Sequence, residues 1–450
     1  MGAAAHLSCA AWLGLACRSS SGTSGKQTHT CFRRGPHCPR AGANVPTAGQ
    51  APAAQLVRCG HPSAATLKNN QHLASRRTEM TSFTQAHSTH RTDVVIIGGG
   101  QSGLALGYYL SRRGQRYIIL DSGSEVGHMW RNRWESLQLI TPCPYNNLPG
   151  QDFEGPAWSF PTKDQVADYL ARYAQKFSIP VRTQHHVSSL RREGDVYRIE
   201  TNQGVFEALA VVIATGPYHE PRIPEAARGV DERVVQLHSK DYRKPQQIPG
   251  GQDVLVVGCG NSGAGIAQDL ARVHQVHLAL GRTAWLRRRI FGRDLFWWSH
   301  LLGLPRVTAD SRLGSRMKQQ PDEVIGTSPE RLAAEHGIKL QSRVMAVEGN
   351  EVHFADGTRH RFGGIVWATG YRPHYPWVQV PVFTEQGAPV HQRGVSNSPG
   401  LYFLGLKWQY HFDSSLLGGV GRDAEFIDQE IASYLSNRVP QEAASLEATP

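Results

Sequence analysis

A glycine pattern that occurs twice is the strongest constraint on how this chain folds. Its first copy follows residues 93–97, DVVII, an apolar run that predicts a buried parallel strand. Gly98, Gly100 and Gly103 come next, in the spacing Gly-x-Gly-x-x-Gly. The helical pattern LALGYYLSRRG follows, and then YIILD, which predicts a second strand ending in Asp121. The sequence thus predicts a strand–loop–helix–strand unit of an α/β fold.

The three glycines of this unit suit a phosphate-binding loop. Gly98 permits a tight turn, Gly100 lets the backbone approach a pyrophosphate, and Gly103 lets helix and strand pack closely. The first turn of the helix offers free N–H groups and the positive end of the helix dipole to phosphates. Asp121 lies about twenty residues further on, where a carboxylate can hold ribose hydroxyls. We therefore predict a nucleotide site rather than a glycine-rich turn of an ordinary α/β domain.

The second copy of the pattern differs at one informative place. Residues 254–257, VLVV, precede Gly258, Gly260 and Gly263, and the strand VHLAL follows the next predicted helix. That strand ends without a carboxylate, and Arg282 comes shortly after it. An acid there would repel a 2′-phosphate, whereas an arginine can pair with one. The second unit is therefore predicted to bind NADPH, and the first a nucleotide with a free ribose, such as FAD.

Two further segments match each other and indicate how the units are connected. Residues 208–224 and 361–373 each contain an apolar strand, then Ala-Thr-Gly and a proline-containing turn. Repetition at corresponding places predicts one domain inserted into another. The expected fold class is α/β, with two three-layer, Rossmann-like dinucleotide-binding domains, the NADPH domain being inserted into the FAD domain.

The expected domain boundaries follow from these segments. The FAD domain should take residues 92–222 and 366–440, and the NADPH domain residues 223–365. Residues 1–91 are expected to form a disordered extension and residues 441–450 a disordered tail. The extension has ten Lys or Arg and one acid, so it holds +9 of the formal net charge of +11. The remaining chain is close to neutral, which argues against a nucleic-acid partner.

The cysteines, like the positive charge, are concentrated in the N-terminal extension. Five of the seven lie in the first sixty residues, and only Cys143 and Cys259 lie in the body, where they form no C-x-x-C. The body is therefore expected to be a reduced, cytoplasmic-type protein without disulfides or a metal site. The extension can instead be an organelle transit peptide, or an artefactual addition before a start at Met80. The sequence contains no run of eighteen or more apolar residues, so a membrane-spanning helix is not expected.

Three stretches outside the glycine units keep two interpretations each. Trp130 and Trp134 either form a wall around a flat cofactor or are buried under a loop. The glycine-rich run SSLLGGVGRDAEFIDQEIASYL predicts a loop and a helix, which either faces a flavin with its N-terminus or is a plain terminal helix. Residues 285–305 are aromatic and apolar, and we expect local packing there rather than a pocket wall or membrane contact. Within that stretch, residues 287–289 are expected to be a solvated arginine face.

Together these residues resemble the class B flavoprotein monooxygenases, most nearly the plant YUCCA-type enzymes and the bacterial flavoproteins similar to them. The resemblance covers about residues 92–436 and rests on GGGQSG, WRNRWESLQLITP, FPTKDQVADYL, VIATGPYHEPRIP, VVGCGNSG, WATGYRP and LLGGVGRDAEFI. It implies FAD in the first unit, NADPH in the second, and a small-molecule substrate and O2 as partners. It also implies that reduced flavin reacts with O2 to a C4a-(hydro)peroxyflavin, which passes one oxygen to the substrate.

The motifs carry the family's cofactor contacts onto particular residues, and no conspicuous acid–base pair suggests a catalytic residue. The predicted cofactor-binding residues are Gly98, Gly100, Gln101, Ser102, Gly103, Asp121, Trp130, Arg131, Thr215, Gly216, Gly258, Gly260, Asn261, Ser262, Gly263, Arg282, Thr369, Gly370 and Asp423.

The sequence departs from the family pattern in two places. The family's stretch F-x-G-x-x-x-H-x-x-x-Y/F is represented by ERVVQLHSKDY, which keeps His238 and Tyr242 but has Glu232 and Val234 at the Phe and Gly positions. In the family this histidine links nucleotide binding with domain movement, and the alternative is a linker histidine with a structural hydrogen bond. Pro142 stands where many animal-type members place an asparagine near the flavin.

Two other classes of flavoprotein also have two dinucleotide sites or could use them without oxygenation. A two-dinucleotide disulphide reductase needs a redox-active cysteine pair, which Cys143 and Cys259 do not form. A non-oxygenating oxidoreductase or a redox-sensing flavoprotein stays open because of the altered motif. The substrate is open as well, and N- or S-oxygenation, oxidative decarboxylation and Baeyer–Villiger insertion all fit.

The assignment of the two riboses can be tested at Arg282. The variant Arg282→Asp should weaken the use of NADPH much more than the retention of FAD, because only the 2′-phosphate of NADPH needs the guanidinium. The KM for NADPH and the flavin absorbance of the purified protein are the two measurements. An equal loss of both would show that the assignment is wrong.

Overall fold

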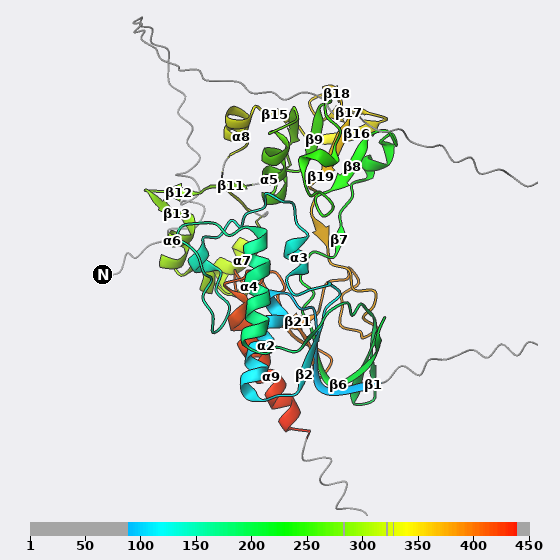
Figure 1. Cartoon of the computed structure of the whole chain (residues 1–450), viewed down its shortest axis with the longest axis vertical. Coiled ribbons are helices and arrows are strands. Elements are labelled where there is room, and N and C mark those ends of the chain that lie inside the picture. Colours follow the sequence, from blue (N-terminus) through cyan, green and yellow to red (C-terminus); the bar gives the residue numbers. More distant parts are fainter. Residues whose placement is uncertain (1–88, 282–283, 321–322, 327, 439–450) are drawn as a thin grey trace, which may run out of the picture. The chain divides into compact units, whose positions relative to one another are not determined.

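The computed structural model describes residues 89–281, 284–320, 323–326 and 328–438 (Figure 1). Strand β1 (Thr89–Ile97) begins three residues before the expected start of the FAD domain at residue 92 and pairs along its length with β6 (Gly204–Ile213). The rest of the expected extension, with the Met80 start, lies outside the described residues. The same holds for the expected tail 441–450 and for Arg282.

The first sheet has a parallel core that contains the first glycine unit. Its strands run in the order β21-β22-β23-β6-β1-β2-β3, and the hairpin β4–β5 joins it along β6. Neighbours in the run β23-β6-β1-β2-β3 are all parallel, as the buried apolar runs predict. The remaining strands are β2 (Tyr117–Leu120), β3 (Val181–Arg182), β4 (Val187–Glu193), β5 (Val196–Thr201), β21 (His391–Gln392), β22 (Val395–Ser396) and β23 (Leu401–Phe403).

Alternate side chains of β1 point into two different cores. Val94 and Ile96 pack under the helices α2 (Gln101–Arg113), α4 (Lys163–Lys176) and α9 (Val420–Ser436). Val95 and Ile97 pack on the opposite face, against the β4–β5 hairpin and residues 375–382. The three helices lie along one face of the sheet in Figure 1. This two-sided burial gives the predicted three-layer domain.

The second sheet repeats this plan around the second glycine unit. The strands β15 (Lys339–Gln341), β10 (Val276–Ala279), β9 (Val254–Val257), β19 (Gly364–Trp367) and β8 (Val235–His238) are parallel and lie in that order.

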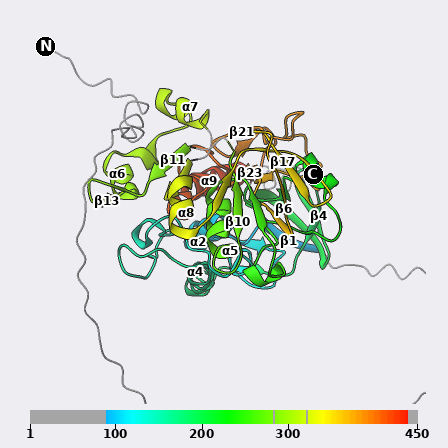
Figure 2. The same cartoon turned by 90° about the horizontal axis from the view of Figure 1, so that it is seen from above.

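Side chains of β9 also alternate between two cores. Val256 packs under α5 (Asn261–Leu270) and α8 (Pro329–His336), whereas Leu255 packs on a small antiparallel sheet. That small sheet consists of β16 (Val344–Glu348), β17 (Glu351–Phe354) and β18 (Arg359–Arg361). Figure 2 shows α5 and α8 on one side of β10 and β17 on the other. The second unit is thus a second three-layer, Rossmann-like domain.

The connections confirm that the second domain is inserted into the first. The chain passes from β6 to the second sheet through β7 (Glu220–Pro221) and returns to β23 through β20 (Tyr371–Arg372). These two segments pair with each other as antiparallel strands, Tyr371 opposite Pro221. The expected boundary between residues 365 and 366 falls inside β19, which stays in the second sheet to its last residue, Trp367.

The remaining elements are short and belong to neither large sheet. The strands β11 and β14 form a parallel pair, and β12 and β13 form an antiparallel pair. Their bounds, with those of the short helices, are α3 (His128–Arg131), η1 (Cys143–Tyr145), η2 (Glu225–Gly229), η3 (Pro245–Gln247), β11 (Ala284–Arg287), β12 (Arg289–Ile290), β13 (Arg293–Asp294), α6 (Leu295–Leu301), η4 (Leu304–Arg306), α7 (Arg312–Lys318) and β14 (Glu323–Gly326).

The expected solvated arginine face at residues 287–289 is wrong for its middle member. Arg288 Nη2 donates to the carbonyl of Ile140 (2.7 Å), and the guanidinium stacks over the ring of Phe160. Burial lowers the pKa of Arg288. The pairing with Asp294 on β13 offsets part of that burial cost. No helix among the described residues is long and apolar enough to cross a bilayer.

The packing of α9 on the first sheet can be tested with two substitutions on opposite faces of the helix, two residues apart. Ile427 is fully buried in the core under α2 and α9, so Ile427→Ala should lower the free energy of unfolding by about 2–5 kcal/mol. Gln429 is exposed on the same helix, and Gln429→Ala should change it by less than about 0.5 kcal/mol. Urea denaturation followed by circular dichroism measures both. Equal effects would contradict the assigned core face.

Candidate functional site

The first glycine loop (residues 98–103) is held by backbone contacts that only glycine allows. Gly98 has φ of +111°, and a Cβ there would lie 2.5 Å from the carbonyl oxygen of Ala214. A Cβ on Gly103 would overlap the carbonyl oxygen of Gly98. The tight turn and the close packing predicted for these two glycines are therefore present, and they bring the end of β1 onto the start of α2.

Gly100 has a different role, because space lies open next to it. It is the N-cap of α2, no side chain caps that helix end, and a Cβ on Gly100 would meet nothing within 4 Å. The first-turn N–H groups of a helix have no partner within the helix. An uncapped N-terminus beside open space fits the pyrophosphate of a dinucleotide.

Asp121 borders this loop from the end of β2. Its Oδ2 accepts a hydrogen bond from the Gly99 N–H (2.6 Å), and its Oδ1 accepts one from the Gly123 N–H (2.8 Å). The carboxylate therefore fixes the backbone of the glycine loop as well as standing at the predicted ribose position.

The second glycine loop (residues 258–263) is built in the same way. Gly258 has φ of +98°, and a Cβ there would lie 2.5 Å from the carbonyl oxygen of Ala368. A Cβ on Gly263 would overlap the carbonyl oxygen of Gly258, whereas one on Gly260 would meet nothing within 4 Å. Gly260 is also an N-cap without a side-chain cap, at the start of α5. A second dinucleotide fits here by the same argument.

The shared geometry of the two loops explains why an Ala-Thr-Gly segment accompanies each of them, which the sequence alone did not show. Ala214 and Ala368 follow β6 and β19, the strands next to β1 and β9, and each donates its N–H to the last residue of that neighbour (2.8 Å). The carbonyl of each alanine then lies against the first glycine of the loop. The signal was available in the sequence as a repeated segment at a matched distance from each loop.

The threonines and glycines of these segments lie beside the interdomain connections. Thr215 Oγ1 is 3.0 Å from His219 Nε2, and Thr369 Oγ1 donates to the Arg222 carbonyl. Gly216 and Gly370 both have positive φ, +72° and +84°. The chain therefore turns sharply after each threonine, where it leaves one sheet for the other.

His238 is the last residue of β8, and its side chain is hydrogen-bonded to the segment that leads back to the first domain. Its Nδ1 accepts a hydrogen bond from the Lys240 N–H (3.1 Å), so Nε2 carries the proton and donates to the Gly370 carbonyl (3.1 Å). Burial lowers the pKa of His238, which favours this neutral form. The structure thus shows the structural hydrogen bond of the linker interpretation, at the point where the domains connect.

The altered positions of the motif around His238 are compatible with the fold. Val234 is buried in the core under the small antiparallel sheet and is absent from the positive-φ residues, so its backbone does not require glycine. Glu232 is exposed. Tyr242 is buried, and its hydroxyl donates to Asp269 Oδ2 on α5 (2.9 Å).

The structure does not bring all the predicted residues together. Trp130 packs at the edge of the core under α2 and α4, whereas Trp134 packs in the core of the second domain, against α5. Arg131 is engaged by Asp168 (2.7 Å) and Asp164 (3.3 Å) of α4. Trp134 shares its core with Cys259 of the second glycine loop, whereas Arg131 pairs with acids of α4.

Residues at the start of α2 contact the chain that precedes α9. Gln101 Nε2 donates to the Ser415 carbonyl (2.9 Å), and a Cβ on Gly405 would overlap Ser102 Oγ. The glycine-rich run thus lies beside the first loop, and whether the N-terminus of α9 faces a flavin stays a prediction. Asn146, which the sequence analysis missed, is buried there, and Thr141 donates to its side-chain oxygen (2.5 Å).

Asp423 and Asn261, two further predicted cofactor residues, differ in their surroundings. Asp423 is fully buried in α9, both its oxygens lack a hydrogen-bond donor, and its nearest titratable neighbour is His411 Nδ1 at 3.7 Å. Asn261 Oδ1 accepts a hydrogen bond from the Ile325 N–H (3.2 Å), and Ser262 follows it in the first turn of α5.

Both cysteines of the described residues are free, buried thiols. Burial raises the pKa of Cys259 to about 12, and Cys143 Sγ lies 3.2 Å from Ser159 Oγ. A thiolate, the form that exchanges disulfides, is therefore disfavoured at Cys259.

Comparisons with known proteins agree with this geometry. A sequence model of the pyridine nucleotide-disulphide oxidoreductase family matches residues 95–290. An uncharacterized CzcO-like oxidoreductase of Geobacillus kaustophilus is 41% identical over 347 residues, which cover 77% of this chain and 99% of the relative. The chain belongs to this family of oxidoreductases. It is therefore a flavoprotein oxidoreductase, and the family binds FAD and NAD(P)H.

More distant relatives extend the likeness to monooxygenases. The indole-3-pyruvate monooxygenase YUCCA4 of Oryza sativa subsp. japonica is 28% identical, over 76% of this chain and 87% of its own. The structure of a flavin-containing monooxygenase from Stenotrophomonas maltophilia superposes with a TM-score of 0.65 and 28% identity, covering 77% of this chain and 99% of that one. The fold, with its two Rossmann-like sheets, is thus shared with solved flavin monooxygenases.

The different roles of the loop glycines can be separated by substitution. Gly103→Ala should both lower thermal stability and abolish FAD retention, because its Cβ overlaps the backbone of Gly98. Gly100→Ala should leave the melting temperature of the apoprotein within a few degrees of wild type, because its Cβ meets nothing, yet it should reduce FAD retention at least about tenfold by blocking the pyrophosphate. Thermal melts and flavin absorbance measure the two effects. Full FAD retention in Gly100→Ala would contradict the site.

Proposed function

We propose that this oxidoreductase is an NADPH-dependent flavoprotein monooxygenase that oxygenates a small organic molecule. The observation that carries the proposal is the duplication of one loop geometry, at residues 98–103 and 258–263, on two separate parallel sheets. Two such loops on one chain suit two dinucleotides held at once, one resident and one exchanging. The likeness to YUCCA-type and flavin-containing monooxygenases supports the oxygenating reaction.

Each loop is assigned one cofactor by its flanking residues. The first loop, with the N-terminus of α2 and Asp121, would hold FAD. The second loop, with the N-terminus of α5, would hold NADPH, and Arg282 would pair with the 2′-phosphate, although it lies outside the described residues. When bound, FAD supplies the electron transfer from NADPH and the activation of O2.

The protein's own contribution is orientation rather than acid–base chemistry. The backbone of the loops would hold both pyrophosphates, and the hydrogen bond from His238 to the Gly370 carbonyl ties β8 to the connection between the two domains. Accurate placement of the two reacting rings is worth a large share of such a reaction's rate.

The cysteines favour oxygenation over disulphide reduction. Cys259 lies inside the second glycine loop with a pKa raised to about 12, and Cys143 lies in η1, far from it in sequence. These are the cysteines of the described residues, and they do not form the reactive dithiol that we expect of a disulphide reductase. The family name alone therefore does not define the chemistry of this chain.

The proposal is tested by following both NADPH and oxygen. The purified holoprotein, supplied with NADPH and ¹⁸O2, should convert at least one member of a panel of indole-3-pyruvate, amines, sulfides and cyclic ketones to a product with one ¹⁸O atom, detected by mass spectrometry. Hydrogen peroxide as the sole oxygen product with every substrate would contradict oxygenation and favour a non-oxygenating oxidoreductase. A flavin that NADPH does not reduce in stopped-flow spectra would favour a redox-sensing protein.

The role of His238 yields a separate prediction. His238→Ala removes the hydrogen bond to Gly370, so flavin reduction by NADPH should slow by on the order of tenfold to a hundredfold through misplacement of the domains. FAD retention should be unchanged, because the first loop is not touched. Stopped-flow reduction rates provide the measurement, with His336→Gln, an exposed histidine of α8, as the control. An unchanged rate would leave His238 without a role in positioning.

A further inference from the structure

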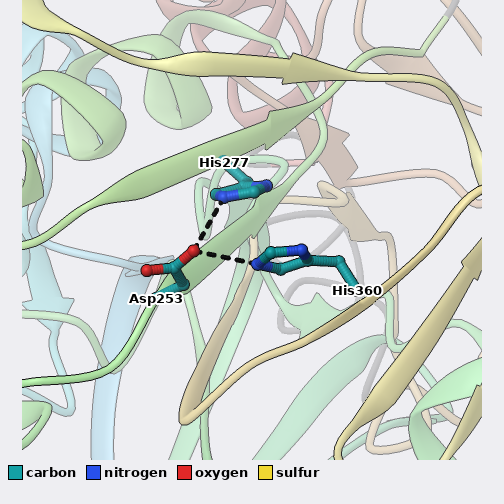
Figure 3. Close-up of side chains that lie close together, drawn as sticks. All are labelled: Asp253, His277 and His360. Carbon is teal, nitrogen blue, oxygen red and sulfur yellow. Dashed lines mark hydrogen bonds and ion pairs between the residues drawn. The ribbon is translucent and has the colours of Figure 1, made fainter.

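Three side chains of the second domain meet at the end of its sheet that lies opposite the nucleotide loop. Asp253 immediately precedes β9, His277 lies on β10, and His360 lies on β18 of the small antiparallel sheet. Asp253 Oδ2 is 3.0 Å from His277 Nε2 and 2.8 Å from His360 Nε2 (Figure 3). The three ligand atoms lie within 4.8 Å of one another, although the residues are far apart in the sequence.

The surroundings hold these side chains in place. The two imidazole rings stack with their centroids 4.3 Å apart, and Phe362 packs edge-on against His277 at 5.0 Å. Gln341, on the neighbouring strand β15, lies with its Nε2 2.9 Å from His277 Nδ1. His277 is only 2% exposed, whereas 39% of the His360 side chain is exposed, so the cluster is open to solvent on one side.

We propose that Asp253, His277 and His360 form a binding site for a divalent transition-metal ion of the zinc class. Two imidazole nitrogens and one carboxylate oxygen are a donor set that such ions prefer, and the fourth position would be taken by water. In a tetrahedral zinc site, neighbouring ligand atoms lie about 3.3 Å apart. The separations of 2.8 and 3.0 Å between Asp253 Oδ2 and the two histidines therefore need to widen by a few tenths of an ångström. The two histidine nitrogens lie within 4.8 Å of each other and would adjust to the same spacing.

The protonation states suit a metal at neutral pH. Burial, with the neighbouring His360 adding to it, lowers the pKa of His277 to about 4, so its ring is neutral. Burial would raise the pKa of Asp253, but the hydrogen bonds from His360 and His277 act against burial and the pKa is lowered, so the carboxylate is ionised. Metal ligands must be in these forms, neutral imidazole and ionised carboxylate.

The residues around the cluster can rearrange their hydrogen bonds and charges when a metal binds. His277 Nε2 would give up its proton to face the ion, and Nδ1 would then carry the proton and donate to Gln341 Oε1 after rotation of the amide. Lys339 is the charged group nearest the carboxylate, with Nζ 4.0 Å from Asp253 Oδ2. Its side chain is 53% exposed, so it can turn into water when the ion takes its place.

The position of the site predicts what a metal would do. Asp253 and His277 belong to the large parallel sheet, and His360 to the small sheet that covers it. A bound ion would therefore tie the two layers together and stabilise the second domain. The four residues of β9 separate it from the second glycine loop, so the metal would not contact the nucleotide.

The test uses metal-free, tag-free full-length protein and Zn²⁺ as the probe. Isothermal titration calorimetry should show one equivalent of Zn²⁺, and saturation should raise the melting temperature. Replacement by Co²⁺ should give the visible absorption of a tetrahedral site. His360→Gln and Asp253→Asn should abolish this one-equivalent binding, and Gln341→Leu should weaken it by about 10–100-fold.

Controls separate this site from unspecific binding and from the proposed reaction. His336→Gln, an exposed histidine of the same domain, should leave Zn²⁺ binding unchanged. Because His360 is partly exposed, His360→Gln should fold, and a melting curve of the metal-free variant checks this. No binding by the wild type at 100 µM Zn²⁺, or equal binding by wild type and a folded His360→Gln, would overturn the proposal. Flavin content and NADPH oxidation do not enter these readouts, so the site and the proposed function can fail independently.

Discussion

Both glycine loops depend on one backbone contact, the close approach of a glycine to an alanine carbonyl. Gly98 meets Ala214, and Gly258 meets Ala368, each at a distance that leaves no space for a Cβ. The contact sets where the neighbouring strand ends relative to the loop, and through the overlap at Gly103 or Gly263 it sets where the next helix starts. The open space at Gly100 and Gly260 exists only because those positions are fixed.

The same contact explains the insertion. Each alanine opens an Ala-Thr-Gly segment, and each of these segments leads directly into a connection between the domains. The residues that shape a binding loop are thus followed by the residues that link the sheets. His238 adds to this arrangement, since it bonds to the Gly370 carbonyl at the end of the second segment. The cofactor sites and the connections therefore share a few consecutive residues.

The sequence predicted the features that follow from local pattern. Strand periodicity and glycine spacing predicted both three-layer domains, because buried parallel strands and tight loops are encoded by adjacent residues. The repeated Ala-Thr-Gly segments predicted the insertion. Contacts between residues that are far apart in the sequence could not be predicted from local pattern. Trp130 and Trp134 are four residues apart and yet belong to different cores, and Arg131 is engaged by acids of α4. Asp253, His277 and His360 carry no motif spacing, so only the fold shows that they meet.

The pairing of β7 with β20 has a consequence for the history and the engineering of such a chain. Pro221 and Tyr371 lie opposite each other, so the inserted domain leaves and rejoins its host at almost one point. A module attached in this way can be exchanged by a single cut-and-join of neighbouring strands, without disturbing the order of the host sheet. Under the proposed cofactor assignment, the choice of reductant would then belong to the inserted module alone, separate from the domain that would hold the flavin.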